Sequence, residues 1–185
     1  MISRRNLVGA LAAMCAVGWL AAVTPAQAAS ADELNAAADA TLERLKRSEP
    51  VSETMIERAK GILVFPEIVK AGLLVGAAGG KGVLRVGGET EGYYRSRAVS
   101  YGLQAGVTTF GYVMFLMDDE AVEFVRDTSG WEVGVGPNIT IADAGVAKKL
   151  STSTAQEGIY VFFVDQEGFF AGLGLEGTKI SKIAE

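Results

Sequence analysis

The stretch from Ala59 to Gly82 constrains the fold of this chain more than any other part of the sequence. It contains a short apolar run at residues 61–65, which Pro66 interrupts, and a second apolar run from Ala71 that gives way to glycines. Short apolar runs bounded by glycine and proline are typical of buried strands rather than of long helices. The stretch therefore predicts the centre of a sheet, and it indicates a fold more clearly than a reaction.

The N-terminal segment predicts export from a bacterial cytoplasm. Residues 1–28 have the three parts of a secretory signal, namely paired arginines, an apolar run and a small-residue cleavage site: Arg4 and Arg5, Leu7–Val23, and Ala26-Gln27-Ala28. We expect cleavage after Ala28 and a periplasmic or envelope-associated protein. The arginine pair fits both the twin-arginine route and the ordinary secretory route, and an uncleaved anchor is the remaining alternative.

The length of the rest of the chain predicts one domain, and its composition excludes several classes of function. Residues 29–185 are enough for a single domain with its own core. The only cysteine, Cys15, lies in the expected signal and the chain has no histidine, which excludes zinc sites of Cys/His type and Ser-His or Cys-His catalysis. The net charge is −5, and without Arg4 and Arg5 it is 15 minus 22, or −7, which argues against nucleic acid as a partner.

Two helices are expected before the sheet. Ser30 begins a capping box, and the helix that follows, about Ala31–Arg47, repeats apolar residues along one face. Its polar face is mixed in sign, so packing on the domain is favoured over lying on a membrane surface. Pro50 ends this helix, and a second short helix, Ser52–Lys60, is expected to begin with a serine cap.

After the second helix the chain changes to glycine-spaced runs of strand-forming residues. The expected elements are a strand at Ile62–Phe65, an irregular crossing at Pro66–Lys70, strands at Leu73–Ala78, Lys81–Val86, Tyr93–Val99 and Tyr101–Met117, a helix capped by Asp118 or Asp119, a strand at Trp131–Ile141, and a hairpin of Gly158–Val164 with Phe169–Leu175. This order predicts an α+β fold with two N-terminal helices. Its sheet is expected to be mostly antiparallel and strongly curved, and it could close into a barrel.

Glycine is concentrated in this predicted sheet. Twelve of the 23 glycines lie between Gly61 and Gly111, although strand interiors normally avoid a residue that adds no side chain and costs backbone entropy. A sheet that bends hard, or that another element approaches closely, accounts for this concentration.

No catalytic, metal or nucleotide motif in the sequence is complete. Gly80-Lys81 offers the centre of a phosphate loop, but Val75 and Gly82 stand where its first glycine and its hydroxyl belong. Asp118-Asp119-Glu120 lacks the alternating spacing of a calcium loop and fits helix capping better. The other carboxylates are not brought together by their spacing. We therefore expect no enzyme, no cofactor and no metal site.

Five cations fall in or beside the glycine-rich sheet, and they are the candidate binding residues: Lys70, Lys81, Arg85, Arg95 and Arg97. Lysine and arginine in such positions suit phosphate head groups. The alternative for each of them is an ordinary solvated charge. Lys70 and Lys81 stand out because apolar residues and glycines surround both of them in the sequence.

Four blocks together resemble the SYLF domain family, over about residues 34–183. They are Ala59–Leu84, Val113–Met117, Trp131–Pro137 and Tyr160–Gly177. The resemblance implies a lipid-binding module, since eukaryotic members are associated with phosphoinositides and membranes, and some with actin. It also implies a lysine at Lys70 and structural glycines at the positions where the family pattern has them: Gly72, Gly76, Gly80, Gly82, Gly172 and Gly174.

The resulting hypothesis is a non-enzymatic phospholipid-binding domain of the periplasm or envelope. It would engage the anionic head groups of a membrane surface through Lys70, Lys81 and the nearby arginines, assisted by the first helix. The alternative is a structural or partner-binding envelope protein that uses the glycine-rich face of its sheet, with the protein partner unknown.

Overall fold

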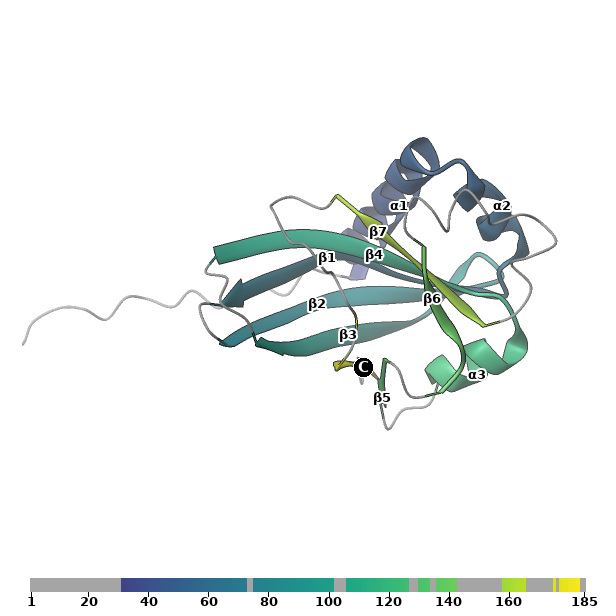
Figure 1. Cartoon of the computed structure of the whole chain (residues 1–185). Coiled ribbons are helices and arrows are strands. Elements are labelled where there is room, and N and C mark those ends of the chain that lie inside the picture. The colour runs from purple at the N-terminus through teal and green to yellow at the C-terminus, as the bar shows by residue number, and fades with distance from the viewer. Residues whose placement is uncertain are drawn as a thin grey trace, which may run out of the picture.

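The computed structural model describes residues 31–72, 75–101, 106–126, 130–133, 136–142, 158–165, 175 and 177–183. These residues form three helices and one sheet of eight strands (Figure 1). The expected signal segment, most of the second strand of the terminal hairpin, Gly172 and Gly174 lie outside the described residues.

The helices and strands follow one another in the expected general order. The helices are α1 (Ala31–Ser48), α2 (Val51–Arg58) and α3 (Asp119–Arg126). The strands are β1 (Gly61–Gly72), β2 (Val75–Val86), β3 (Glu89–Tyr101), β4 (Gly106–Leu116), β5 (Trp131–Glu132), β6 (Ile139–Ile141), β7 (Ile159–Val164) and β8 (Thr178–Lys182).

The sheet curls into a half-barrel with the strand order β5-β8-β3-β2-β1-β4-β7-β6. Every pair is antiparallel except β6 with β7. Figure 1 shows the four long strands β1 to β4 projecting at the left, away from all three helices. The predicted α+β class with a curved, mostly antiparallel sheet is confirmed. The edge strands β5 and β6 do not pair with each other in the described part of the chain, so the sheet stays open there.

Pro66 does not end a strand, contrary to the irregular crossing predicted at this point. β1 continues through it to Gly72, with a bulge between Phe65 and Ile68 in its pairing with β4. Proline has no N–H to donate to a neighbouring strand, and a bulge is the place in a sheet where that donor is not required. The bulge therefore lets one strand contain the proline.

Three other predicted boundaries are wrong. β2 runs unbroken through Gly79 and Gly80, where the sequence predicts two strands. The strand predicted at 131–141 is two short strands on opposite edges of the sheet, because Gly136 has φ of +120°, which no strand residue adopts. Ser52 lies inside α2 instead of capping it, since Pro50 occupies the N-cap position without any side-chain cap.

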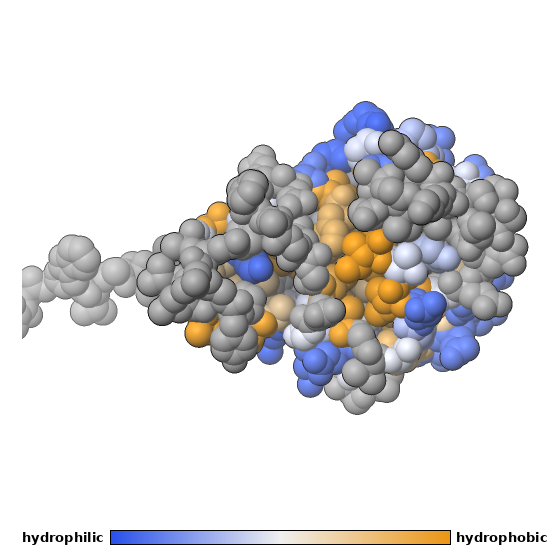
Figure 2. Space-filling view, in the orientation of Figure 1, coloured by the Kyte–Doolittle hydropathy of each residue, from blue (hydrophilic) through white to orange (hydrophobic). Residues whose placement is uncertain are grey.

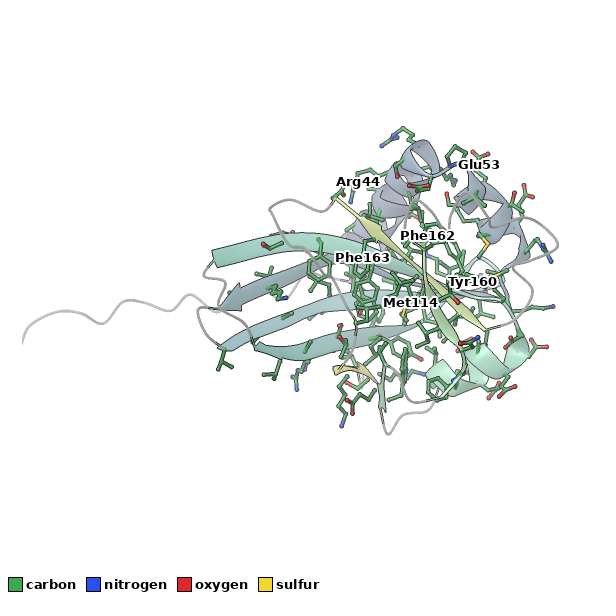
Figure 3. All side chains as sticks on the ribbon, in the orientation of Figure 1. Arg44, Glu53, Met114, Tyr160, Phe162 and Phe163 are labelled. Atoms are coloured by element: carbon green, nitrogen blue, oxygen red, sulfur yellow. The ribbon has the colours of Figure 1, made fainter. Side chains whose placement is uncertain are left out.

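The two faces of the sheet carry separate cores. On the side where α1 packs, here called the α1 face, Val64, Val83 and Val113 contact the apolar stripe of α1. The opposite side, here called the α3 face, carries the cluster that includes α3 and β5. The neighbouring residues Phe162 and Phe163 of β7 show the alternation, because they join the α1-face and the α3-face cluster respectively (Figure 3).

The apolar stripe of α1 is buried inside the domain, which confirms packing over the membrane-surface interpretation of this helix. The polar side of α1 is also tied to the sheet. Asn35 donates through Nδ2 to the hydroxyl of Tyr93 at 2.9 Å and accepts through Oδ1 from Thr90 at 2.7 Å. The helix thus exposes no large apolar side chain with which to assist a membrane contact.

Glycines on the α3 face of β1 and β2 let the two strands approach each other closely. A Cβ atom at Gly80 would lie 2.1 Å from the carbonyl oxygen of Glu67, and one at Gly82 would lie 2.6 Å from that of Val64. A Cβ atom at Gly72 would lie 2.3 Å from the Cα of Gly76. Because these contacts are to backbone, a side chain at any of the three would force the strands apart.

We expect Gly80→Ala to lower the free energy of unfolding by about 1–3 kcal/mol, the usual cost of overpacking. The matched control is Gly79→Ala, because Gly79 lies on the open α1 face and its Cβ would only reach 3.3 Å from a carbonyl oxygen. The control should change the stability by less than about 1 kcal/mol. Urea unfolding of both variants measures the difference, and equal losses would contradict the close approach.

A two-pronged ion pair holds α3 to β3. Arg126 donates from Nε and Nη2 to the two carboxylate oxygens of Glu91, at 2.7 and 2.6 Å, and from Nη1 to Glu123 at 2.5 Å. The hydrogen bond from Arg126 is the main reason that the pKa of Glu91 is lowered, and burial opposes it. Glu91 therefore stabilises the folded state in its charged form.

This pair predicts a pH-dependent contribution to stability. Since the folded-state pKa of Glu91 lies below its ordinary value of 4.5, the contribution is fully present above that value and is lost as the pH falls through the folded pKa. Glu91→Gln should therefore unfold at a lower temperature than the parent at pH 7. The two melting temperatures should converge as the pH falls below the folded-state pKa of Glu91, and a difference that persists there would point to lost packing instead of lost charge.

Candidate functional site

Three of the five candidate cations lie together on the α1 face. Lys81 of β2 stands directly opposite Arg95 of β3, and Arg97 follows two residues further along β3, opposite Gly79. Residues opposite each other in an antiparallel pair point to the same face, and two residues along a strand span about 7 Å. All three lie beyond the valines that α1 covers, and Arg97 is exposed.

A fourth cation joins this group through the tertiary structure. Lys179 of β8 is exposed and stands opposite Arg97, on the same face. We call the four residues Lys81, Arg95, Arg97 and Lys179 the basic patch. Sequence reasoning missed Lys179 because no strand is predicted at 178–182 and nothing in the sequence shows that β8 pairs with β3.

The basic patch has few negative charges around it. Among the described residues, no ion pair involves any of its four members. The nearest carboxylates by strand register are Glu132, opposite Lys179 on β5, and Glu67, in the bulge of β1. Like charges directly opposite each other destabilise a sheet. The basic patch contains two such pairs, Lys81 with Arg95 and Arg97 with Lys179, and this favours a role in binding an anion.

Lys70 is on the other face of the sheet. It stands opposite Ala78 of β2 and Thr108 of β4, whose side chains lie on the α3 face, and it is half-buried. The sequence singles out Lys70 and Lys81 together, but the structure does not bring these two lysines to one site. The bulge in β1 and the alternation of side chains across the sheet separate them.

Arg85 holds α1 to the sheet. Its Nη1 forms an ion pair with Asp39 of α1, and its Nη2 donates to the backbone carbonyl of Asn35 at 3.3 Å. The side chain of Arg85 is only 16% exposed. The structure therefore gives this predicted binding residue a structural partner, at the end of β2 away from the basic patch.

The Asp118 carboxylate at the start of α3 is occupied by backbone amides. Asp118 accepts through Oδ1 from the amide of Ala121 at 2.7 Å, and through Oδ2 from the amide of Gly158 at 2.6 Å. This confirms the capping interpretation.

A cavity of about 410 Å³ lies beside the start of α3, lined by Asp118, Glu120, Pro137, Asn138 and Gly158. Within the described residues, no group of three or more potential ligands could hold a metal ion.

The buried tyrosines offer no reactive group. Burial raises the pKa of Tyr94 to about 12, and burial also raises the pKa of Tyr112, whose hydroxyl donates to Ser96 at 2.9 Å. Both therefore stay protonated at neutral pH.

None of the described helices is both long and apolar enough to pass through a bilayer.

Comparison with known proteins agrees with the resemblance seen in the sequence. Residues 97–185 match the family model Ysc84, described as a Las17-binding protein and actin regulator. The SH3 domain-containing YSC84-like protein 1 of Homo sapiens and that of Pongo abelii are each 29% identical over 132 residues, and the protein of Bos taurus is 28% identical over 131. The matches cover 67% of this chain and 37–38% of those proteins, so the chain spans well under half their length.

The different roles of Arg85 and Lys81 predict opposite effects on stability. We expect Arg85→Gln to lower the free energy of unfolding by about 1 kcal/mol, because it removes a charged hydrogen bond between α1 and the sheet. Lys81→Gln should leave stability unchanged or raise it slightly, because it relieves repulsion from Arg95. Chemical unfolding at low salt measures both, and equal losses would contradict this assignment.

Proposed function

Since residues 97–185 of this chain belong to the Ysc84 (SYLF) family, we propose that it is a non-enzymatic phospholipid-binding protein of the bacterial envelope. It binds the anionic head groups of a membrane surface through the basic patch. The N-terminal segment, by its signal-like sequence, supports a periplasmic or envelope-associated location.

The observation that carries the proposal is the basic patch itself. Four cations gather on a strand surface that none of the described helices covers, and no carboxylate of the described residues pairs with them. Phosphate head groups supply the missing negative charge, and lysine and arginine bind phosphate through charge-assisted hydrogen bonds. Each cation near an anionic membrane surface contributes about 1 kcal/mol to binding.

The distribution of charge also supports this orientation. The chain as a whole is acidic, with a net charge of −5, so it must approach an anionic surface by its basic side. The three helices together carry nine acidic and five basic residues, and Figure 1 places them at the end of the molecule opposite the projecting strands. The molecule thus has an acidic helical end and a basic strand surface.

The side-chain chemistry of the chain is consistent with a binding function. The chain has no histidine, its one cysteine is Cys15, and the Asp118 carboxylate is occupied by two backbone amides. The family description also names a binding protein and a regulator.

Co-sedimentation with vesicles tests the proposal. The full chain should bind vesicles of phosphatidylglycerol and phosphatidylcholine more tightly than phosphatidylcholine alone, and the difference should shrink as salt rises. Lys81→Gln with Arg97→Gln should weaken binding to the anionic vesicles roughly 30-fold, since two cations are removed.

The matched control is Arg47→Gln with Lys60→Gln, which removes the same charge from exposed positions at the helical end. The N-terminal segment is common to all variants, so the comparison between the two double variants isolates the basic patch. Equal affinities for the two double variants would remove the patch as the binding site, and no preference for anionic vesicles would remove the proposed function.

A protein partner is the second candidate, because the matching family is described by its binding to Las17 and its regulation of actin. On this alternative, the part of the α1 face that the described helices leave uncovered would accept another polypeptide. Pull-down from an envelope extract that survives high salt, without any binding to anionic vesicles, would favour it.

A further inference from the structure

The exposed apolar side chains of the described residues are concentrated at one end of the sheet. Four of the five large ones are valines near the projecting ends of β1 to β4: Val69, Val75, Val99 and Val107, with exposed fractions of 43, 58, 59 and 71%. We call these four residues the apolar tip. Figure 1 shows this end of the strands projecting beyond the helices, and Figure 2 shows apolar residues along the outline there.

The strand register places the apolar tip on the same face as the basic patch. Val107, Ala71, Ala77 and Val99 form one row across β4, β1, β2 and β3, and Val69 lies in the next row with Arg97. Lys81 and Arg95 form the row after that. The rows are separated by about 7 Å, so the cations lie about 7 and 14 Å behind the row of Val99 and Val107, and Val75 lies one row further out.

The sequence keeps charge out of the projecting end. No charged residue occurs between Lys70 and Lys81, or between Arg97 and Asp118. On each of the strands β1, β2 and β3, a cation marks the boundary of the uncharged part at the projecting end. These cations are Lys70, Lys81 and Arg97. Long cationic side chains at such a boundary can keep their charge in a polar layer while their stems contact apolar surroundings.

We propose that the apolar tip inserts into the outer layer of an anionic bilayer, with the basic patch at the level of the lipid phosphates. This inference rests on the proposed function and adds to it which part of the molecule enters the membrane. The distance of about 7 Å between the row of Val99 and Val107 and the nearer cations suits it, because amphipathic helices in the interface bury their apolar face to a similar depth, about 5–10 Å. Valine side chains gain free energy by leaving water there.

Charge complementarity selects the bilayer over a second copy of the chain. Two copies joined through their tips would bring their basic patches toward each other, and like charges would oppose the contact. An anionic bilayer satisfies both halves of this surface, because its phosphates face the cations and its acyl chains face the valines.

Site-directed spin labelling tests the insertion directly. In a Cys15→Ser background, Val99→Cys and Glu89→Cys place a label at either end of the same strand, β3. With phosphatidylglycerol-containing vesicles, the label at position 99 should become accessible to oxygen and protected from a water-soluble nickel chelate. The label at position 89 should remain in water, and an aqueous label at 99 on vesicle-bound protein would overturn the inference.

A pair of uncharged variants tests the energetic role of the tip. Val99→Asn with Val107→Asn should weaken binding to the same vesicles roughly tenfold or more, without changing the charge of the surface. The matched control is Ile141→Asn, because Ile141 is the fifth large exposed apolar residue and lies on the edge strand β6, away from the tip. Equal affinity of the tip variant and the parent would overturn the inference.

The outcomes separate this inference from the proposed function. Binding that depends on Lys81 and Arg97 but not on the valines would leave surface binding in place and overturn insertion. No binding to anionic vesicles would overturn both. Self-association of the chain that Val99→Asn with Val107→Asn abolishes, without any vesicle binding, would assign the tip to a second copy instead.

Discussion

The structure depends on the close approach of β1 to β2. At Gly80 and Gly82 the neighbouring strand comes so near that a single added carbon atom would lie 2.1 or 2.6 Å from a backbone oxygen. Glycine makes this contact possible at the cost of backbone entropy. The bulge that contains Pro66 stands at the same place, and together these features curl the sheet into a half-barrel.

The two faces of the curled sheet are buried to different extents. The α3 face encloses a large core with Phe65, Tyr112 and Trp131. The α1 face is covered by a helix over only part of its length, and the rest carries the basic patch and the apolar tip. A helix that covered the whole length of the long strands would have left no such surface. The part of the α1 face that none of the described helices covers is therefore the candidate binding site.

Ionic interactions divide the cations in and beside the sheet into two classes. Arg85 is paired with Asp39 and Arg126 with Glu91, so these charges join helices to strands. The members of the basic patch have no such pairs among the described residues, and they face one another across strands instead. Charges of the first class stabilise the fold, whereas those of the second oppose it slightly and become favourable when an anion is bound.

Local sequence determined much of the framework. The amphipathic repeat of α1, the glycine turn between β2 and β3, the cap at Asp118 and the apolar strands are all properties of neighbouring residues, so patterns in the chain predict them. The continuation of β1 through Pro66 could not be predicted in this way, because it depends on the strands on either side.

The sequence by itself determined which residue types were present: a sheet rich in glycine, no imidazole, and cations at the edges of uncharged stretches. Only the tertiary structure decided which of these cations act together. Strand register put Lys179 beside Arg97, and the alternation of side chains put Lys70 on the face opposite Lys81. The physical reason is that pairing between strands far apart in the chain is fixed by hydrogen bonds and packing across the sheet, which no local pattern encodes.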